Sequence, residues 1–543
     1  MNPNFHVVDF LVFGLYALII IGVGLWVSRT KKGHKKTAED YFLAGKALPW
    51  WAIGSSLIAA NISAEQFIGM SGSGFAGGLA IAAYEFMAAL ALIIVGKFFL
   101  PIFIKQGIYT IPEFVEKRFS TNLKTILAVF WIALFIFVNL TSVLFLGGKA
   151  LDVIIGNGDG SMVLPAIICL ALVAAAYSLY GGLSAVAWTD VIQVALLVIG
   201  GLITTIIALH YVTPDGGIIN GISHIADVAG DKFDMVLSRD NKEYNNLPGI
   251  YVIIGGIWVA NLYYWGFNQY IIQRTLAAKS LKEAQRGIAF AAFLKMLIPF
   301  IVVIPGIVAW VMYSEGTFGS KEAFEIAGST SLNNDNAYPW LISTFVPIGL
   351  KGLVLAALAA AIVSSLASML NSTSTIFTMD IYKPYVNKNA SQTKLVNVGR
   401  LTAGISLIIA VLFAPLLGNI DQMFQYIQEY TGIVSPGILA VFLMGLFWKK
   451  ATNKAAIWGI LASIPVALFF KLFPTEMPFM DQMFYTCIIT IAIIFMVSLT
   501  SNPNDDDTKA IHLTSDMFKT DKVFNICAYI ICILIAVIYA ALW

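Results

Sequence analysis

The stretch that decides the fold is Ala59-Ala60-Asn61-Ile62-Ser63-Ala64-Glu65-Gln66, inside an apolar span that runs from Pro49 to about Met70. A lipid bilayer offers no water to hydrogen-bond these polar groups or a loosened backbone. A lone Asn or Ser would usually bond to a neighbouring helix, but four polar residues within six positions favour a bundle interior or a wet cavity. The stretch therefore predicts an interrupted helix at a binding site.

The composition identifies a polytopic membrane protein. Of the 543 residues, 59% are hydrophobic and only 12% charged, and the mean hydropathy is +0.81, which excludes a soluble globular protein. The five histidines are scattered and the four cysteines lie in apolar segments, so neither a metal site nor a disulfide framework is indicated. A net charge of +2 gives no indication of nucleic-acid binding.

Apolar runs of membrane-spanning length predict fourteen transmembrane helices. They lie near residues 7 to 28, 49 to 71, 79 to 104, 125 to 148, 162 to 180, 188 to 211, 249 to 270, 287 to 313, 346 to 370, 401 to 416, 422 to 447, 455 to 472, 480 to 500 and 524 to 542. The first is interpreted as a spanning helix and not a signal peptide, because no basic segment precedes it and a lysine cluster follows it. The longer loops, 211 to 249 and 313 to 338, are polar and are expected to be solvated.

Lysine and arginine fall mainly in the loops after odd-numbered spans, 24 against 6 on the other side, and Arg118 and Arg274 are counted among the 24. Positive loops stay on the cytoplasmic side, so both termini are expected on the outer or periplasmic side of a plasma or bacterial inner membrane. Lys295 lies well inside its span and needs a partner.

A weak internal symmetry accompanies the first polar interruption. Five spans later, the seventh span carries Asn261-Leu262-Tyr263-Tyr264-Trp265-Gly266-Phe267-Asn268-Gln269. Paired interrupted helices in two halves of five spans are typical of an inverted-repeat secondary transporter, with its site where the broken helices meet. Because five is odd, the two halves have opposite topology.

Polar side chains in several spans could bind a sugar-like solute through hydroxyl contacts and one aromatic face. The candidates are Gln66, Glu85, Asn261, Tyr264, Lys295 and Gln428. Two alternatives remain open: Glu85 and Lys295 could merely neutralise each other, and Asn261 or Gln428 could serve only interhelical hydrogen bonds.

A coupling ion would need neutral oxygens, and Ala361-Ile362-Val363-Ser364-Ser365-Leu366-Ala367-Ser368 places two adjacent hydroxyls in a small-residue helix. Such residues often only permit close helix packing. Together with the carbonyls of Ala59 and Ile62 in the interrupted helix, however, they could form a sodium site.

Gly72-Ser73-Gly74-Phe75-Ala76-Gly77 matches the dinucleotide-binding pattern G-x-G-x-x-G literally. It joins two membrane spans instead of a strand and a helix, so a dinucleotide site is rejected. The glycines are expected to form a flexible external loop.

The chain resembles the sodium:solute symporter family over almost its full length. The resemblance is strongest to the bacterial sodium/galactose branch and the related animal sodium/glucose cotransporters, and three runs make it specific. They are Asn61 to Met70, Tyr180 to Gln193 (Tyr-Gly-Gly-Leu-Ser-Ala-Val-Ala-Trp-Thr-Asp-Val-Ile-Gln) and Phe424 to Gly432. The resemblance implies an all-α polytopic membrane protein whose core is two inverted five-helix repeats of the amino-acid/sodium symporter type. The implied divisions are an extra helix and basic cytoplasmic loop (1 to 46), a first repeat (47 to 212), an external loop (213 to 248), a second repeat (249 to 447) and three C-terminal helices (448 to 543).

The resemblance also implies roles for individual residues. Gln66, Glu85, Asn261, Lys295 and Gln428 would bind sugar hydroxyls, Tyr264 would stack on the ring as an inner gate, and Met70, Tyr84 and Phe424 would form an outer hydrophobic gate. Carbonyls of Ala59, Ile62 and Ala361 with hydroxyls of Ser364 and Ser365 would bind sodium, and Asp190 would lie on the ion's exit path. Ala88 departs from the pattern of the sodium/galactose branch, where a serine lies near the sugar, which leaves the particular hexose open.

The expected function is sodium-coupled import of a neutral hexose, galactose or glucose, by alternating access, with no enzymatic activity and no organic cofactor. The alternative within transport is a sodium symporter for inositol, sialic acid or an amino acid. A membrane-embedded sensor or enzyme is disfavoured because neither a signalling domain nor a nucleophile, base or metal constellation is recognisable.

Overall fold

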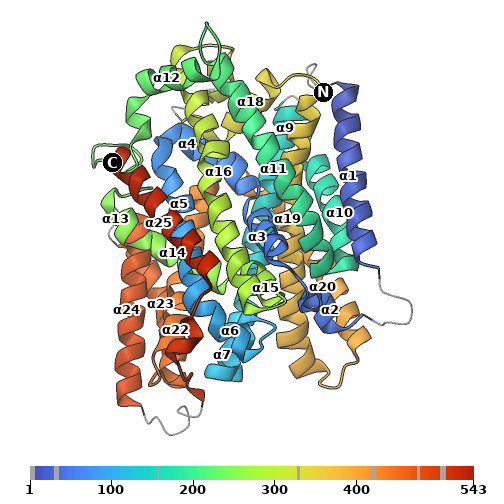
Figure 1. Cartoon of the computed structure of the whole chain (residues 1–543), viewed down its shortest axis with the longest axis vertical. Helices are drawn as coiled ribbons and strands as arrows, with labels where there is room; N and C mark the ends of the chain where they lie inside the picture. The colour runs from blue at the N-terminus through green and yellow to red at the C-terminus, as the bar shows by residue number, and fades with distance from the viewer. Residues whose placement is uncertain are drawn as a thin grey trace.

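The computed structural model describes residues 6–29, 36–156, 158–326, 331–418, 423–473, 477–501 and 509–543. Within these ranges every regular element is a helix, apart from two isolated β-bridges, Leu48 with Ala278 and Glu325 with Leu332. The helices stand side by side along the long axis of the molecule, and shorter helices cross its two ends (Figure 1). The all-α prediction is confirmed for the described part of the chain.

The helices of the first half are α1 (Val7–Val27), α2 (Ala38–Phe42), α3 (Trp50–Asn61), α4 (Ser71–Gly77), α5 (Ala83–Ile94), α6 (Leu100–Gln106), α7 (Ile111–Arg118), α8 (Thr121–Leu134), α9 (Thr141–Ile155), α10 (Val163–Gly181), α11 (Leu183–Tyr211) and α12 (Ile218–Val228). The second half contains α13 (Ile250–Ile254), α14 (Gly256–Phe267), α15 (Gln269–Leu276), α16 (Leu281–Glu315), α17 (Ser320–Phe324), α18 (Ala337–Phe345), α19 (Leu350–Ile376), α20 (Gln392–Phe413), α21 (Met423–Gly432), α22 (Ser435–Phe447), α23 (Asn453–Leu472), α24 (Phe479–Thr500) and α25 (Lys522–Ala541).

Eleven helical segments of the described chain are long and apolar enough to cross a membrane, or twelve if α21 and α22, bent by 49°, form one span. The predicted count of fourteen is therefore not confirmed. Two of the predicted spans are built from short pieces: α3 and α14 have 12 residues each. At 1.5 Å per residue each piece covers about 18 Å, which is less than the hydrocarbon thickness.

The interruptions occur in both spans that the sequence indicated. Helix α3 ends at Asn61, Ile62 is extended (φ −79°, ψ 106°), and the chain resumes in a π-helix, η2 (Glu65–Met70). Helix α14 ends at Phe267, Asn268 is extended (φ −79°, ψ 121°), and α15 follows. The two breaks thus share one backbone conformation, and each releases carbonyl groups that a continuous helix would use.

The core of the bundle surrounds these two broken helices. Long helices α11, α16 and α19 pack against α3, and α19 is buried along almost its whole length. Its small residues, among them Ala356, Ala360 and Ala367, are all buried and permit close approach of neighbouring helices. Among the described candidate spans, the most deeply buried one therefore carries the hydroxyls that were predicted to bind an ion.

The glycine-rich segment is not the flexible loop that was expected. Residues 71 to 77 form helix α4, and Gly72, Ser73, Gly74 and Phe75 are buried. A Cβ at Gly74 would lie 2.9 Å from the carbonyl oxygen of Val303 on α16, and one at Gly72 would lie 2.5 Å from Asp335. These glycines permit close contact between helices. The glycine spacing in the sequence is the same whether the glycines serve helix packing or loop flexibility.

The contact between α4 and α16 gives a stability prediction. A Cβ at Gly306 would lie 2.1 Å from the carbonyl oxygen of Ser71, so Gly306→Ala should separate the helices and cost about 1 to 3 kcal/mol. Gly404 on α20 has nothing within 4 Å, and Gly404→Ala is the matched control. We expect a lower thermal unfolding midpoint in detergent only for Gly306→Ala; equal midpoints for the two variants would contradict the packing.

Candidate functional site

One cavity collects all six residues that the sequence nominated for solute binding. Its lining comprises Asn61, Glu65, Gln66, Tyr84, Glu85, Ala88, Ala260, Asn261, Tyr263, Tyr264, Trp265, Lys295, Phe424, Gln428, Thr431, Ser435 and Met483. These side chains come from α3, η2, α5, α14, α16, α21, α22 and α24, and the first and last of them, Asn61 and Met483, lie 422 residues apart in the sequence. A cavity lined by amides, hydroxyls, one ion pair and several aromatic rings suits a small polar solute with an apolar face.

Glu85 and Lys295 form an ion pair at this cavity, which confirms that the intramembrane lysine has a partner. The Lys295 ammonium donates to Oε2 of Glu85, and the two side chains are 1% and 3% exposed. The ammonium also lies 5.3 Å from the ring centroid of Trp265. Opposite charges compensate each other here because neither could remain alone in so apolar a position.

The side-chain amide of Gln66 is held at the break by hydrogen bonds to Ser63, three residues earlier. Its Oε1 accepts from the backbone N–H of Ser63 (3.0 Å) and from the Ser63 hydroxyl (3.3 Å). The first of these bonds satisfies a backbone N–H group that the interrupted helix leaves without an intrahelical partner. The carbonyl of the Gln66 amide is thereby occupied, and its two N–H donors remain for a ligand in the cavity.

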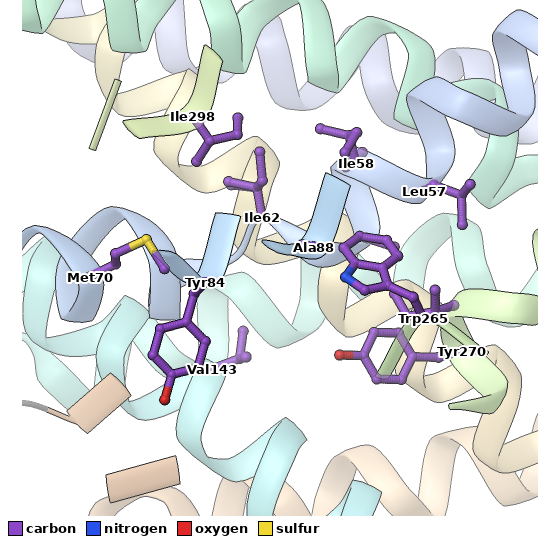
Figure 2. Close-up of a cluster of buried hydrophobic side chains, with 14 of the residues drawn as sticks. Leu57, Ile58, Ile62, Met70, Tyr84, Ala88, Val143, Trp265, Tyr270 and Ile298 are labelled. Atoms are coloured by element: carbon purple, nitrogen blue, oxygen red, sulfur yellow. The ribbon is translucent and has the colours of Figure 1, made fainter. Parts of the chain in front are cut away.

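Tyr264 connects the two broken helices. Its hydroxyl accepts from Nδ2 of Asn61 (3.0 Å), the last residue of α3, and from the hydroxyl of Tyr270 (2.6 Å) on α15. Figure 2 shows Tyr270 next to Trp265 on one side of a cluster of buried hydrophobic side chains, with Tyr84 on the other side. The sequence identified Tyr264 but not the contributions of Asn61 and Tyr270, since each bond joins residues of different helices.

This link gives a graded prediction. Tyr264→Phe keeps the ring but leaves the buried amide of Asn61 without its acceptor, whereas Tyr270→Phe removes one donor and keeps that amide paired. An unsatisfied buried group costs about 1 to 3 kcal/mol, so the Michaelis constant for solute should rise more in Tyr264→Phe than in Tyr270→Phe. Uptake kinetics at fixed sodium will measure this, and a larger effect in Tyr270→Phe would contradict the assignment.

The three residues expected to form a hydrophobic gate lie close to the cavity in different ways. Tyr84 and Phe424 line it, with ring centroids 5.0 Å apart and an interplanar angle of 87°. Met70 is fully buried but does not belong to the lining. It lies next to Tyr84 in the cluster of buried hydrophobic side chains (Figure 2). Phe424 also packs on η2, since a Cβ at Gly69 would lie 2.8 Å from it.

The residues nominated for sodium lie where α19 passes the break in α3. The hydroxyl of Ser365 donates to the carbonyl of Ala60 (3.0 Å), and that of Ser364 donates to Oδ1 of Asp190 (2.5 Å). Ala59, Ile62, Ala361, Ser364 and Ser365 are all fully buried. Because each hydroxyl hydrogen is directed to another acceptor, the oxygen lone pairs of both serines remain for a cation.

Asp190 belongs to a buried network that sequence reasoning missed. Its Oδ2 accepts from the hydroxyl of Ser56 (2.5 Å) and lies 3.6 Å from a guanidinium nitrogen of Arg274. Arg274 also donates to the carbonyl oxygens of Ser56 (3.1 Å) and Tyr270 and to the hydroxyl of Ser368. The guanidinium compensates the carboxylate, so Asp190 can orient Ser364 without leaving a bare charge.

Arg274 had been assigned to a basic loop in the charge tally, and that assignment is wrong. The residue lies in α15, with its side chain 1% exposed. Arg118, also counted as a loop residue, is buried and donates to the carbonyl oxygens of Gly445 (2.9 Å) and Ala451 (3.0 Å). The sequence signal for the burial of Arg274 is the apolar run Tyr270-Ile271-Ile272, which ends two residues before it.

Glu65, which has no predicted role, lies in the cavity lining. Its Oε1 is buried and has no hydrogen-bond partner among the described residues. Because Glu85 and Lys295 form an ion pair, Glu65 is the one carboxyl group in the described lining that has no cationic partner there. The described lining therefore holds no unpaired cation that could compensate an anionic ligand.

Comparison with known proteins identifies the family and several relatives of this chain. The model of the sodium:solute symporter family matches residues 41–463. A sodium/glucose cotransporter of Vibrio parahaemolyticus is 63% identical over 540 residues, which is 99% of this chain and 98% of the relative. A sodium/myo-inositol cotransporter of Mus musculus is 33% identical over 85% of this chain and 66% of its own length.

A solved structure shares the fold. The substrate-bound, outward-open state of a Na⁺-coupled sialic acid symporter superposes with a TM-score of 0.79 at 26% identity, and the match covers 92% of this chain and 99% of the other. The broken helices, the cavity and the serine pair thus occur in a chain whose architecture is that of sodium-coupled transporters.

Proposed function

Because this chain belongs to the sodium:solute symporter family, we propose that it couples the entry of sodium to the import of a neutral hexose, galactose or glucose. The family makes the chain a multi-pass membrane transporter and not an enzyme. The identity of the solute is the part that needs argument from the site.

The observation that carries the proposal is the charge balance of the cavity. Lys295 is the one cationic residue in the described lining, and Glu85 already neutralises it. A carboxylated solute would require a free Arg, a free Lys or a helix N-terminus. Arg274 does not supply this cation, because it is engaged with Asp190 outside the lining.

The donor and acceptor groups suit hydroxyls. Gln66, Asn261 and Gln428 contribute amides, while Glu85 and Lys295 contribute an acceptor and a donor that can contact a ligand while paired. Tyr264 supplies the aromatic face for the apolar side of a pyranose ring. The high identity to a sodium/glucose cotransporter supports the same solute class.

Sodium would bind to the carbonyl oxygens of Ala59, Ile62 and Ala361 and the hydroxyl oxygens of Ser364 and Ser365. The extended backbone at Ile62 frees carbonyl groups of α3, and Asp190 fixes the direction of the Ser364 hydroxyl. Sodium shifts the population only toward the state that binds it better. A state in which the α3 break faces Ser364 and Ser365 is such a state.

The two ligands would communicate through the interrupted helix. Sodium fixes the end of α3, and Gln66 lies directly after the break, so ordering the break also positions a sugar contact. Tyr84, Phe424 and Met70 would then close the cavity on one side and Tyr264 on the other. Rocking of one inverted repeat against the other would exchange the open side.

A competition experiment tests the solute class. Proteoliposomes loaded for counterflow should take up labelled galactose in sodium, and unlabelled galactose and glucose should compete at concentrations near their own Michaelis constants. Sialic acid and amino acids should not compete at tenfold higher concentration. Myo-inositol is the most informative neutral competitor, since a relative is named for it. Preferential competition by inositol or sialic acid would overturn the hexose assignment.

A further inference from the structure

The segment between α11 and α13 contains a helix with three distinct faces. Sequence reasoning expected a solvated loop here, yet α12 places Ile218, Ile219 and Ile222 at the surface with 42%, 83% and 52% of each residue exposed. At 100° per residue these isoleucines share one arc. Asn220, Ser223 and Asp227, all exposed, occupy the adjacent arc, and the buried Gly221 and Ile225 occupy the third.

Three contacts fix the orientation of α12 on the bundle. The backbone N–H of Gly217 donates to Nδ1 of His210 at the end of α11 (2.9 Å). A Cβ at Gly221 would lie 1.9 Å from the carbonyl oxygen of Leu209, so the helix backbone rests directly on α11. His224 bonds Glu315 at the end of α16 (2.8 Å). The exposed isoleucines therefore face a defined direction.

The isoleucine face is continuous with the apolar outside of a membrane-spanning helix. Ile199, Leu202 and Ile206 on α11 are 51%, 39% and 45% exposed at the spacing of one helix face. A groove lined by Ile206, Ile207, His210, Tyr211, Gly217, Ile218, Pro347 and Leu350 joins that face to the start of α12. Figure 1 shows α12 lying across the end of the bundle where α1 begins.

We propose that α12 is an interfacial helix whose isoleucine face, with the groove beside it, lies among lipid acyl chains at the membrane surface. Its apolar arc carries no charged side chain, so the occupant is the acyl region and not an anionic headgroup. The polar arc of Asn220, Ser223 and Asp227 remains in water. Continuity with the lipid-facing side of α11 favours lipid over a protein partner.

The docked helix is also connected to the solute site. Helix α12 passes through Ala229 into the short η6 (Gly230–Phe233). There the ammonium of Lys232 donates to the carbonyl oxygens of Phe75 (3.1 Å) and Ala76 (2.5 Å). These are carbonyls at the end of α4, which follows directly after η2 with Gln66 and Met70. If the proposed function holds, lipid contact at α12 stabilises the far end of the helix that bears a sugar contact.

Spin labelling tests the placement without depending on transport. Single nitroxides at Ile219→Cys and, as the matched control, Asn220→Cys would be introduced after replacement of Cys169, Cys487, Cys527 and Cys532 by serine or alanine. In phosphatidylcholine proteoliposomes we expect strong relaxation by oxygen and weak relaxation by a nickel chelate at position 219, and the reverse at 220. Chelate accessibility at both positions, or protection from both reagents at 219, would overturn lipid docking; the second result would indicate a protein contact.

A second measurement does not need the cysteine-free background. Ile219→Asp should lower the hexose uptake rate about threefold or more in proteoliposomes, because a carboxylate is costly at an acyl boundary, while Asn220→Asp should not. Equal rates in the two variants would contradict the link to the solute site. Absence of sodium-dependent hexose uptake in the unmodified protein would refute the proposed function and leave the spin-label result valid.

Discussion

Glu85→Ala should reduce sodium-dependent hexose uptake to background, at least about a hundredfold below the unmodified protein. The substitution removes an acceptor from the cavity and leaves the Lys295 ammonium buried and unpaired. Truncating one partner of a buried ion pair costs about 3 to 5 kcal/mol, which corresponds to a factor of a hundred or more. Initial uptake rates, normalised to protein recovered in the vesicles, measure the effect.

The double variant Glu85→Gln with Lys295→Met decides between the two roles that the sequence left open for this pair. Both side chains then lack charge and keep most of their volume, so the thermal midpoint should recover relative to Glu85→Ala. If the pair only neutralises charge, uptake should recover with stability. We expect stability to return while uptake stays at background, because both groups also contact the solute; parallel recovery would contradict a binding role.

Ser364→Ala and Ser365→Ala should each raise the sodium concentration for half-maximal uptake about tenfold or more. Each substitution removes a hydroxyl oxygen where α19 faces the carbonyl groups of α3. A neutral-oxygen site has few ligands, so each loss weakens ion binding without changing the solute lining. At saturating sodium the Michaelis constant for hexose should remain near that of the unmodified protein.

Thr373→Val is the matched control on the same helix. Its hydroxyl donates only within α19, to the carbonyl oxygen of Met369 (2.8 Å), and valine preserves its shape. Sodium dependence should therefore be unchanged in this variant. An unchanged sodium response in Ser365→Ala would remove Ser365 from the site, and a shift in Thr373→Val as large as in Ser364→Ala would indicate general weakening of α19.

The site could be predicted because polar side chains are rare inside membrane-spanning segments and are easily recognised in the sequence. Four residues stand out in apolar spans because each requires a partner there: Asn61, Gln66, Glu85 and Lys295. The structure gathers all four around one cavity. The paired interruptions were likewise visible as polar runs five spans apart. Both signals depend on local composition alone.

The features that escaped prediction depend on contacts between distant segments. Arg274 was read as a loop residue because a charge tally counts residues without knowing their partners, and its partner Asp190 lies 84 residues earlier in the chain. The glycines of α4 were read as loop flexibility, although they face Val303 and Asp335. The amphipathic α12 was not recognised because it is only 11 residues long and its four isoleucines are interspersed with Asn, Ser, His and Asp.

The central claim is that sodium entry drives hexose import. The uptake of labelled galactose into proteoliposomes tests it most directly. Vesicles with equal internal sodium and potassium would be diluted into buffers that impose either an inward sodium gradient or an inward potassium gradient of the same size. The account predicts transient accumulation above the external galactose concentration under the sodium gradient only. Equal uptake under both gradients, or uptake that never exceeds equilibrium, would contradict it.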